Sequence, residues 1–489
     1  MKHILLVMIC GLAAWIQAAA PELSMVADPL ENYYSVTGKI PDRKTDLRFF
    51  IGEAGIAAFS LYNPTNATMY CRVGLTGLEA LQPQLREAIH IRARRGQLPA
   101  DVLPEISADG VVVIPAGENR QIFIDLKTRG VKPGKYQGSF TAVNLAGEAA
   151  VNGPLNVEIL PLSLPEKHPL SIMTWDCSLR RTTGAARTKI RNMLMESYVN
   201  AFHVLERPAL KNGKYDFTAM NSLLAELKGE GLIMLRCAAP AQEMNIQEEQ
   251  GAAEYITYIR AIVQNMKAQG FGYDDFVLYP YDENVQDIFY AAARLSKEAD
   301  PKVMVYADPT AKATPEEMKR LFDGKYVDYF QYNASFFNDR GDLIRPFMNS
   351  VKYNSIYWCP VIQKRLRPNS FHRQMGRVAY REKLQGIGYW TSLWMPGSDR
   401  WGLPWDDFRG KTASAVTIYP GRSNDSESIP SRRWRAFRVG LEDYLIFDQV
   451  RRKGNSRLEK KIDNAVQFSR SASESEQLRN EIVNFLLEK

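Results

Sequence analysis

From residue 170 onward, apolar runs of strand length alternate with amphipathic stretches of helical period, and this alternation restricts the possible folds most strongly. The amphipathic stretches carry apolar residues every three or four positions, as in 217–231, 252–270 and 371–386. We expect strands at 170–175, 200–205, 232–237, 276–281, 302–307, 327–332, 354–359 and 386–392. Eight strands alternating with helices over roughly 270 residues predict a (β/α)8 barrel of the TIM type. A doubly wound open sheet is the alternative, but no GxGxxG motif follows a strand.

The preceding segment, residues 21–160, has a different pattern. Short β-rich runs such as "GIAAFSLYN" and "RQIFIDLKT" are separated by Gly, Pro and Asn, which predicts an antiparallel β-sandwich domain. Because closely spaced prolines resist both helix and central strand, we interpret 161–169 as an interdomain linker. We expect the barrel domain over 170–453 and a helical C-terminal extension over 454–489.

The first twenty residues, "MKHILLVMICGLAAWIQAAA", have the layout of a secretory signal peptide. Lys2 provides a positive start, an apolar stretch follows, and Ala18 to Ala20 provide a small-residue cleavage site. Since no later segment is apolar enough to span a bilayer, we expect a secreted or periplasmic protein without an integral membrane segment.

The distribution of charged residues, cysteines and histidines bears on anionic, nucleic-acid and metal partners. The net charge of +7 becomes +6 once Lys2 is removed, which is compatible with an anionic substrate but does not identify one. We interpret the densest basic patch, 91–96, as a solvated loop and expect no nucleic-acid partner. The cysteines and histidines lack metal-site spacing, so we predict no metal and no cofactor, with the cysteines as buried free thiols.

Two adjacent carboxylates, Asp282 and Glu283, follow the aromatic strand "FVLYPY". In a (β/α)8 barrel, catalytic residues gather at the C-terminal ends of the strands, which is where this pair would lie. One interpretation is structural: a carboxylate or Asn284 caps the next helix. The other is catalytic, and it accounts for both acids.

Adjacent carboxylates rarely face each other across a sugar ring at the separation that ordinary glycoside hydrolysis needs. They suit substrate assistance, in which the 2-acetamido oxygen of the sugar attacks the anomeric carbon. One carboxylate then stabilises the resulting oxazolinium, and its neighbour exchanges protons with the leaving group and with water. A like charge next door also raises one pKa and helps to keep the acid protonated.

Aromatic residues near the strand ends are candidates for stacking on a sugar. The alternative for each is that it fills the core. The expected substrate-binding set consists of Trp175, Tyr281, Tyr332, Trp358, Trp390 and Trp394.

Three motifs together resemble glycoside hydrolase family 123 and its wider set of relatives. They are the Asp-Glu pair on an aromatic strand, the "GYW" strand at 388–390, and "AVTIYPGRSNDSESIPSRRWRAFRVGLEDY" at 415–444. "GKYQGSF" before the proline-rich segment is similar to the family's sandwich domain. The resemblance implies a retaining β-N-acetylgalactosaminidase that works by substrate assistance without a metal.

Carried onto this chain, the resemblance implies that Asp282 stabilises the acetamido group and that Glu283 is the general acid and base. It makes Tyr332 the candidate for holding the acetamido group. The chain departs from the family at Asn284, where relatives have proline, in 413–421, which lacks a Gly-Asp-Gly lead, and at Val439.

Two further hypotheses stay open: a glycosidase acting on a non-acetamido or anionic glycan, and a carbohydrate-binding protein without catalysis. A charged set in the last barrel helix matches the C-terminal motif of the family and has a structural interpretation, a buried ion-pair network that joins this helix to the barrel. Its members are Arg433, Arg438, Glu442 and Asp443.

Overall fold

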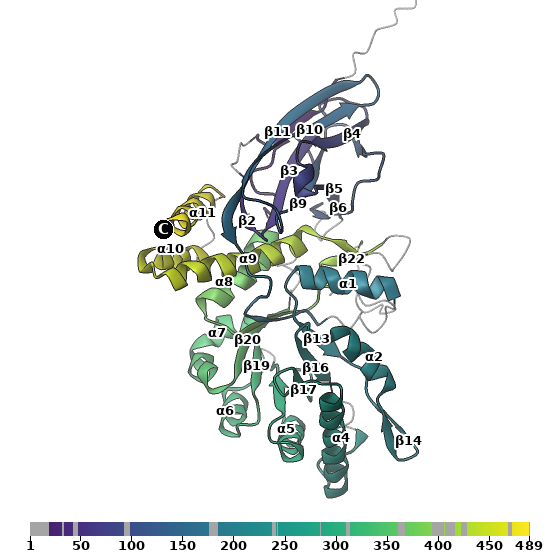
Figure 1. The fold of residues 1–489 in the computed structure, drawn as a ribbon, viewed down its shortest axis with the longest axis vertical. Helices are drawn as coiled ribbons and strands as arrows, with labels where there is room; N and C mark the ends of the chain where they lie inside the picture. Colours follow the sequence, from purple (N-terminus) through teal and green to yellow (C-terminus); the bar gives the residue numbers. More distant parts are fainter. Residues whose placement is uncertain are drawn as a thin grey trace, which may run out of the picture.

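The structure is a computed structural model with a β-sandwich domain at one end, a barrel at the other, and the long helix α9 (Arg432–Lys453) between them (Figure 1). The residues that it describes are 19–31, 34–42, 47–91, 98–175, 184–236, 241, 243–283, 285–309, 313–359, 367–393, 405, 416–421, 428–467 and 472–488.

The N-terminal domain packs two sheets face to face, as the sequence predicts. The first sheet has the order β1 (Glu22–Met25), β3 (Ala54–Tyr62), β9 (Asn119–Lys127) and β5 (Gln84–Glu87). The second has the order β2 (Leu47–Ile51), β11 (Ala149–Ser163), β10 (Gly134–Asn144), β4 (Met69–Thr76) and β8 (Val111–Ile114). Between them, the rings of Phe59 and Phe140 stack with centroids 4.7 Å apart. One strand pair, β2 with β11, is parallel rather than antiparallel.

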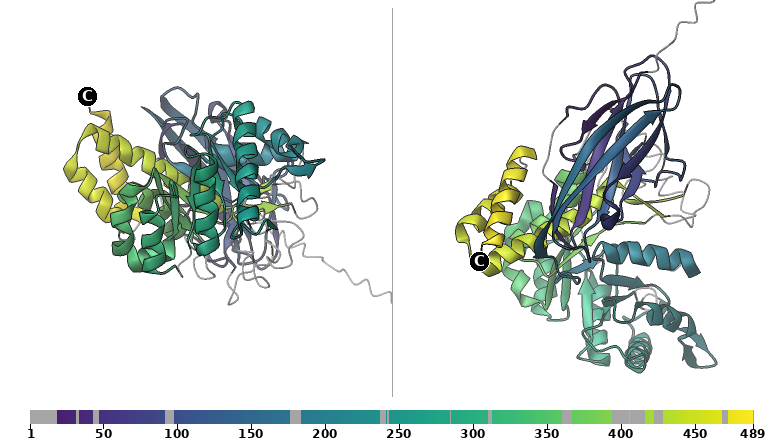
Figure 2. Two further views of the ribbon diagram at one scale, coloured as in Figure 1. Left: turned by 90° about the horizontal axis from the view of Figure 1, so that it is seen from below. Right: turned by 45° about the horizontal axis from the view of Figure 1, so that its top comes forward.

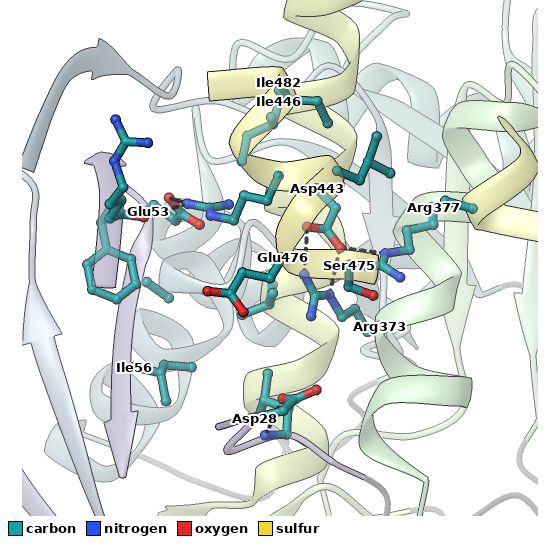
Figure 3. A pocket seen from close by; sticks show the side chains of 18 of the residues that line it. Asp28, Glu53, Ile56, Arg373, Arg377, Asp443, Ile446, Ser475, Glu476 and Ile482 are labelled. Atoms are coloured by element: carbon teal, nitrogen blue, oxygen red, sulfur yellow. Dashed lines mark hydrogen bonds and ion pairs between the residues drawn. The ribbon is translucent and has the colours of Figure 1, made fainter. Parts of the chain in front are cut away.

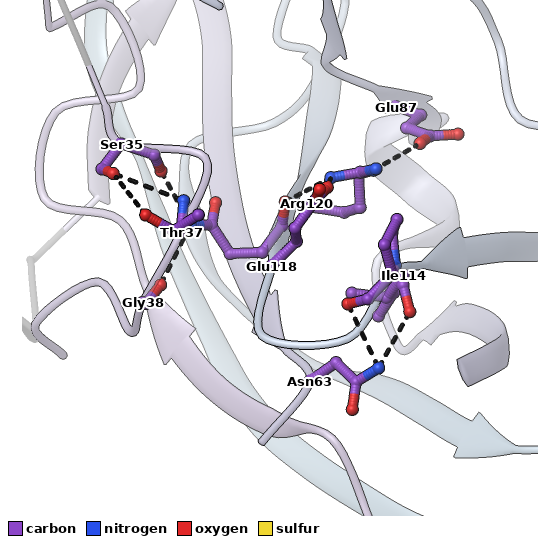
Figure 4. A network of polar contacts seen from close by, with 10 residues as sticks. Ser35, Thr37, Gly38, Asn63, Glu87, Ile114, Glu118 and Arg120 are labelled. Carbon is purple, nitrogen blue, oxygen red and sulfur yellow. Dashed lines mark hydrogen bonds and ion pairs between the residues drawn. The ribbon is translucent and has the colours of Figure 1, made fainter. Parts of the chain in front are cut away.

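Polar side chains tie the turns at one end of the sandwich to its strands (Figure 4). Asn63 donates to the carbonyl oxygen of Ile114 at 2.9 Å, and Arg120 bridges Glu118 at 2.8 Å and Glu87 at 3.6 Å. The Asn63 contact satisfies a backbone carbonyl group at the turn, while Arg120 links two acidic side chains.

The second domain is a closed barrel of eight parallel strands, which confirms the predicted (β/α)8 fold. The strands are β12 (Ser171–Met173), β13 (Ala201–Val204), β16 (Leu232–Arg236), β17 (Phe276–Tyr279), β18 (Met304–Ala307), β19 (Tyr329–Asn333), β20 (Tyr353–Trp358) and β21 (Gly386–Tyr389). Every predicted strand overlaps one of them. Pairing of β21 with β12 closes the ring.

Alternation along each strand divides the barrel into an inner and an outer core. In β17, Val277 and Tyr279 belong to the inner cluster, whereas Phe276 and Leu278 belong to the outer cluster under the helices. The surrounding helices are α1 (Gly184–Glu196), α2 (Thr218–Leu227), α4 (Glu249–Ala268), α5 (Asp287–Ala299), α6 (Pro315–Asp323), α7 (Ala334–Ile344) and α8 (Arg373–Arg381). Shorter elements are β6 (Ile89–His90), β7 (Ala100–Val102), β14 (Ala209–Lys211), β15 (Lys214–Asp216), β22 (Ile418–Pro420), β23 (Ser428–Pro430), η1 (Glu79–Leu81), η4 (Arg345–Ser350) and η5 (Pro368–His372).

The boundary between the domains differs in detail from the expected linker at 161–169. Strand β11 continues through Pro161 to Ser163, so its last three residues lie inside that segment. In the register of β11 with its neighbour β2, the pairing shifts between Ile159 and Ser163. A proline at such an irregularity does not remove a hydrogen bond that the ladder needs.

Helix α9 connects the two domains through buried arginines. Arg433, which is 1% exposed, contacts Asp101 of β7 at 2.8 Å, and Arg435 contacts Asp125 of β9 at 2.5 Å. The predicted network therefore exists, but it joins the last helix to the sandwich as well as to the barrel. The sequence could not indicate this second connection, since the partner Asp101 lies 332 residues away.

On its barrel side, α9 contacts α8. Asp443 accepts hydrogen bonds from Arg373 at 2.7 and 3.0 Å and from Arg377 at 2.6 Å. Figure 3 shows these three side chains at one side of a cavity of about 230 Å³, with Glu53 of the sandwich at the other. The cavity thus lies at the domain junction, and none of the expected site residues lines it.

The C-terminal extension consists of α10 (Ser456–Gln467) and α11 (Ala472–Leu487). In the second view of Figure 2, these yellow helices lie beside the long sandwich strands as well as beside the barrel. Arg479 of α11 bonds to Glu53 at 2.7 Å and to the carbonyl oxygen of Arg48 at 2.8 Å. Within the described ranges, no helix is both long and apolar enough to cross a membrane.

Candidate active site

The two adjacent carboxylates lie where the barrel places catalytic groups, directly after β17 at the C-terminal end of the strand. Both side chains are exposed, although the strand before them is buried. The backbone of Glu283 has a φ of +54°, a left-handed conformation that non-glycine residues rarely adopt. Such strain is concentrated at functional sites, and here it separates the directions of two consecutive side chains.

Asp282 is held by two partners from the barrel wall. Its Oδ2 lies 2.6 Å from Nη2 of Arg236, at the end of β16, and its Oδ1 accepts the hydroxyl of Tyr279 at 2.6 Å. The two contacts fix the direction of the carboxyl group. Asp282 is therefore an oriented side chain at the mouth of the barrel.

Glu283 faces the strand β20 on the other side of the mouth. Its negative charge reaches Tyr357 and Cys359, and together with burial it raises the pKa of the Cys359 thiol to about 11. Burial raises the pKa of Tyr357 above its ordinary value as well. Glu283 therefore lies near the Tyr357 side of the mouth, while Asp282 is paired with Arg236.

A third carboxyl group, Asp308, lies beneath the pair at the end of β18 and is 2% exposed. Its Oδ2 contacts the Tyr279 hydroxyl, and its Oδ1 accepts the backbone N–H of Glu283 at 3.2 Å. Burial, and then the charge of Asp282, raise the pKa of Asp308 well above its usual range.

Aromatic side chains form the inner wall of the mouth. Trp175 meets the rings of His203 and Tyr357 at centroid distances of 5.6 and 5.4 Å, and Trp390 packs against the same inner cluster. Gly388 makes room for this arrangement, since an added Cβ would lie 2.6 Å from Cζ3 of Trp175. Burial lowers the pKa of His203 to about 3, so this ring is neutral.

Three of the predicted substrate-binding residues belong to the outer core: Tyr332 and Trp358 on the outer face of their strands, and Tyr281 just beyond the end of β17. This corrects the expectation for them. Tyr332 is fully buried between Phe330 and Phe337, with ring centroids 5.5 and 5.3 Å away. Tyr281 and Trp358 belong to the same outer core. The reason is the two-residue period of a strand, because the neighbours of inward-facing residues point outward. Trp394 lies outside the described residues.

Trp358 does line a second cavity of about 220 Å³ together with Cys359 and Arg367. This cavity lies between β20, α7 and η5. Trp175 and Trp390 thus share the inner cluster with Tyr279 and Tyr357, the neighbours of Asp282 and Glu283, whereas Tyr281, Tyr332 and Trp358 belong to the outer cluster.

The capping interpretation of the acidic pair is not supported. The N-cap of α5 is Gln286, and its side chain makes no capping hydrogen bond. Asn284, the other capping candidate, lies outside the described residues. By contrast, α6 begins with a capping box between Thr314 and Glu317. Neither Asp282 nor Glu283 is thus needed to begin the following helix.

Four groups of the site were not predicted: Arg236, Tyr279, Asp308 and Tyr357. Asp308 carried a usable signal, because it follows the apolar run "KVMVYA" just as the acidic pair follows its strand. Arg236 ends an apolar strand in the same manner. Among the described residues, no group of three or more His, Cys, Asp or Glu side chains is placed to hold a metal ion.

Comparisons with known proteins agree with this architecture. A scan against family models and a search of curated proteins found no match. Among solved structures, a family 123 glycoside hydrolase from Clostridium perfringens matches 96% of this chain and 99% of its own, with a TM-score of 0.73 and 12% identity. A family 5 mannosidase from Rhizomucor miehei matches 58% of this chain and 94% of its own, with a TM-score of 0.35 and 13% identity. The resemblance to glycoside hydrolase family 123 that the motifs indicate is therefore confirmed at the level of the fold.

Proposed function

We propose that the protein is a retaining glycoside hydrolase that removes terminal β-linked N-acetylhexosamine, with N-acetylgalactosamine as the first candidate. The observation that carries this proposal is the different environment of two consecutive carboxyl groups. Asp282 is paired with Arg236 at 2.6 Å, while Glu283 turns away with a φ of +54° and lies within electrostatic reach of Tyr357 on β20. Two carboxyl groups with different partners are suited to two roles in one reaction.

In the proposed mechanism, the acetamido oxygen of the sugar attacks its own anomeric carbon. Glu283 donates a proton to the glycosidic oxygen as the bond to the anomeric carbon breaks. Asp282 accepts the acetamido N–H and stabilises the positive charge of the oxazolinium. Water, deprotonated by Glu283, then opens this ring from the opposite face and restores the original configuration.

The wall of the mouth supports a sugar ligand. Trp390 is partly exposed and offers an apolar surface on which a pyranose ring can stack, with the buried Trp175 in the same inner cluster. The structural neighbour from Clostridium perfringens is described in terms of glycolipid glycan hydrolysis, which makes glycan chains of glycoconjugates a reasonable first substrate class. The leader-like N-terminus supports a location outside the cytoplasm as part of the same proposal.

The test is hydrolysis of chromogenic β-N-acetylgalactosaminide, β-N-acetylglucosaminide and β-galactoside. We expect activity on the acetamido sugars, and loss of about 10²–10⁴-fold in kcat for Glu283→Gln. Glu316→Gln serves as the control, because Glu316 is an exposed acid in the first turn of α6. Substituting fluorines into the acetyl group weakens its oxygen as a nucleophile, so the rate should fall with each fluorine. Equal rates across that series would exclude substrate assistance.

A further inference from the structure

The hydroxyl of Tyr279 lies between two carboxyl groups, and the number of protons there can be counted. The hydroxyl oxygen is 2.6 Å from Oδ1 of Asp282 and also in hydrogen-bond contact with Oδ2 of Asp308. Two hydrogen bonds among three oxygens need two protons, and a tyrosine supplies one. One of the two carboxyl groups must therefore carry the other proton.

The partners of the two carboxyl groups decide which of them is protonated. Asp282 is partly open to solvent and has the cation of Arg236 as its partner at 2.6 Å. Asp308 is 2% exposed, and no cation among the described residues contacts it. Because a buried carboxylate without a cation is strongly disfavoured, the additional proton belongs to Asp308.

We propose that Asp308 is a positioning residue for the carboxylate pair and acts as a neutral carboxylic acid. Its Oδ2–H donates to the Tyr279 oxygen, the Tyr279 hydroxyl donates to Asp282, and its Oδ1 accepts the N–H of Glu283. The positioning role rests on the proposed function, whereas the protonation state of Asp308 does not.

This arrangement serves both members of the pair. The direction of the hydrogen bonds leaves Asp282 as an acceptor, which is the form that can bind an acetamido N–H. The contact with the N–H of Glu283 helps to hold that residue at its strained φ of +54°. Because Asp308 is neutral, it supports two acids without adding a third negative charge.

Several other ionisable groups surround Asp308, and each has to be considered in a titration. Burial raises the pKa of both Tyr306 and Tyr357, so both are neutral near pH 7, and His203 is neutral above pH about 3. Among the described residues, seven groups face Asp308 directly or through Asp282. They are Tyr279 at the end of β17, Asp282 and Glu283 after it, Tyr306 on β18, Tyr357 on β20, Arg236 on β16 and His203 on β13.

The first test is the stability of Asp308→Asn between pH 4 and pH 8. Asparagine can donate from Nδ2 to Tyr279 and accept from Glu283, so it mimics the neutral acid. Above pH about 4 the unfolded wild type releases the proton of Asp308 while the folded protein keeps it, so the wild type loses stability as pH rises. The variant has no such loss, and its melting temperature relative to wild type should therefore rise steadily over this range.

Asp274→Asn is the matched control, because Asp274 is an exposed acid just before the same strand, β17. The melting-temperature difference between Asp274→Asn and wild type should not rise with pH in this manner. A melting-temperature difference for Asp308→Asn that stays constant or shrinks as pH rises would overturn the proposal.

A second measurement does not depend on the folding of that variant. The infrared spectrum of the wild type at pH 8 should contain the carbonyl band of a protonated carboxyl group, and Tyr279→Phe should shift this band because the acceptor is removed. If the band is absent from the wild type, Asp308 is ionised and the proposal is wrong.

Kinetics test the positioning role separately. Asp308→Asn should keep kcat within about fivefold of wild type with an unchanged pH profile, whereas Asp308→Ala should lower kcat by about 10²-fold while changing KM less. Equal losses of kcat in Asp308→Asn and Asp308→Ala would contradict the positioning role of Asp308. If the wild type hydrolyses no tested glycoside, the proposed function fails, and the infrared and stability measurements still decide the protonation state.

Discussion

Asp443 of α9 accepts two hydrogen bonds from Arg373 of α8, at 2.7 Å to Nε and 3.0 Å to Nη2. A second arginine, Arg377, reaches the same carboxylate at 2.6 Å. One buried carboxylate thus partly neutralises two guanidinium groups at the junction of barrel and sandwich. Burial alone would raise the pKa of Asp443, but the charges of Arg373 and Arg377 hold it well below its usual range.

We expect Asp443→Asn to destabilise the protein by about 3–5 kcal/mol near pH 7, because two partly buried guanidinium groups lose their buried anion. Asp443 has a lowered pKa in the folded state, so its contribution is present above the unfolded pKa of about 3.9 and is lost as pH falls below it. The variant should therefore lose less stability than wild type on acidification. Urea unfolding at several pH values measures both effects. Asp448→Asn, on the same helix, is the control and should change stability by less than about 1 kcal/mol.

The crossing of α8 and α9 depends on two glycines. A Cβ on Gly440 would lie 2.2 Å from the carbonyl oxygen of Arg373, and one on Gly376 would lie 2.0 Å from that of Gly440. Gly440→Ala should therefore cost about 1–3 kcal/mol or more, measured by chemical unfolding. Gly341→Ala in α7 is the matched control. Its Cβ would have no neighbour closer than 3.6 Å, so we expect a neutral or stabilising change there.

Substitution of Asp282 separates its role from that of Glu283. Asp282→Asn removes the negative charge beside Arg236 and should lower kcat on acetamido sugars by about 10²–10³-fold. The loss should be larger with N-acetylated substrates than with any substrate that lacks the acetamido group. A uniform loss across substrates would indicate that Asp282 shapes the site rather than stabilises the acetamido group.

The two tyrosines Tyr332 and Tyr357 test which face of a strand meets the substrate. Tyr332 is fully buried in the outer core, and its hydroxyl has no hydrogen-bond partner, so Tyr332→Phe should leave kcat and KM within about twofold of wild type. Tyr357 lies in the inner cluster within electrostatic reach of Glu283. Tyr357→Phe should change the pH dependence of kcat. Steady-state kinetics over a pH series compares the two variants. A large change of kcat or KM in Tyr332→Phe would support the sequence-based prediction that Tyr332 holds the acetamido group.

Much of the site could be predicted, because chemical type and strand position are both visible in the chain. Asp282 and Glu283 follow a buried aromatic strand, and the structure places them at the C-terminal end of that strand. Tyr332 and Trp358 have the right type and approximate position, but they lie on the outer face of their strands. A strand shows its period of two in the sequence without showing which half of its residues faces the axis.

The sequence by itself determined the eight alternating strands and helices, the sandwich before them and the acidic pair, because period, strand-end position and residue type are local properties. Only the tertiary structure decided which acids act together. Arg236 lies 46 residues before Asp282, and Asp308 lies 25 residues after Glu283, yet closure of the barrel brings all four into hydrogen-bonded contact. The same holds for α9, whose arginines find buried partners in the sandwich more than 300 residues away. Such contacts depend on the packing of whole domains, which no local pattern encodes.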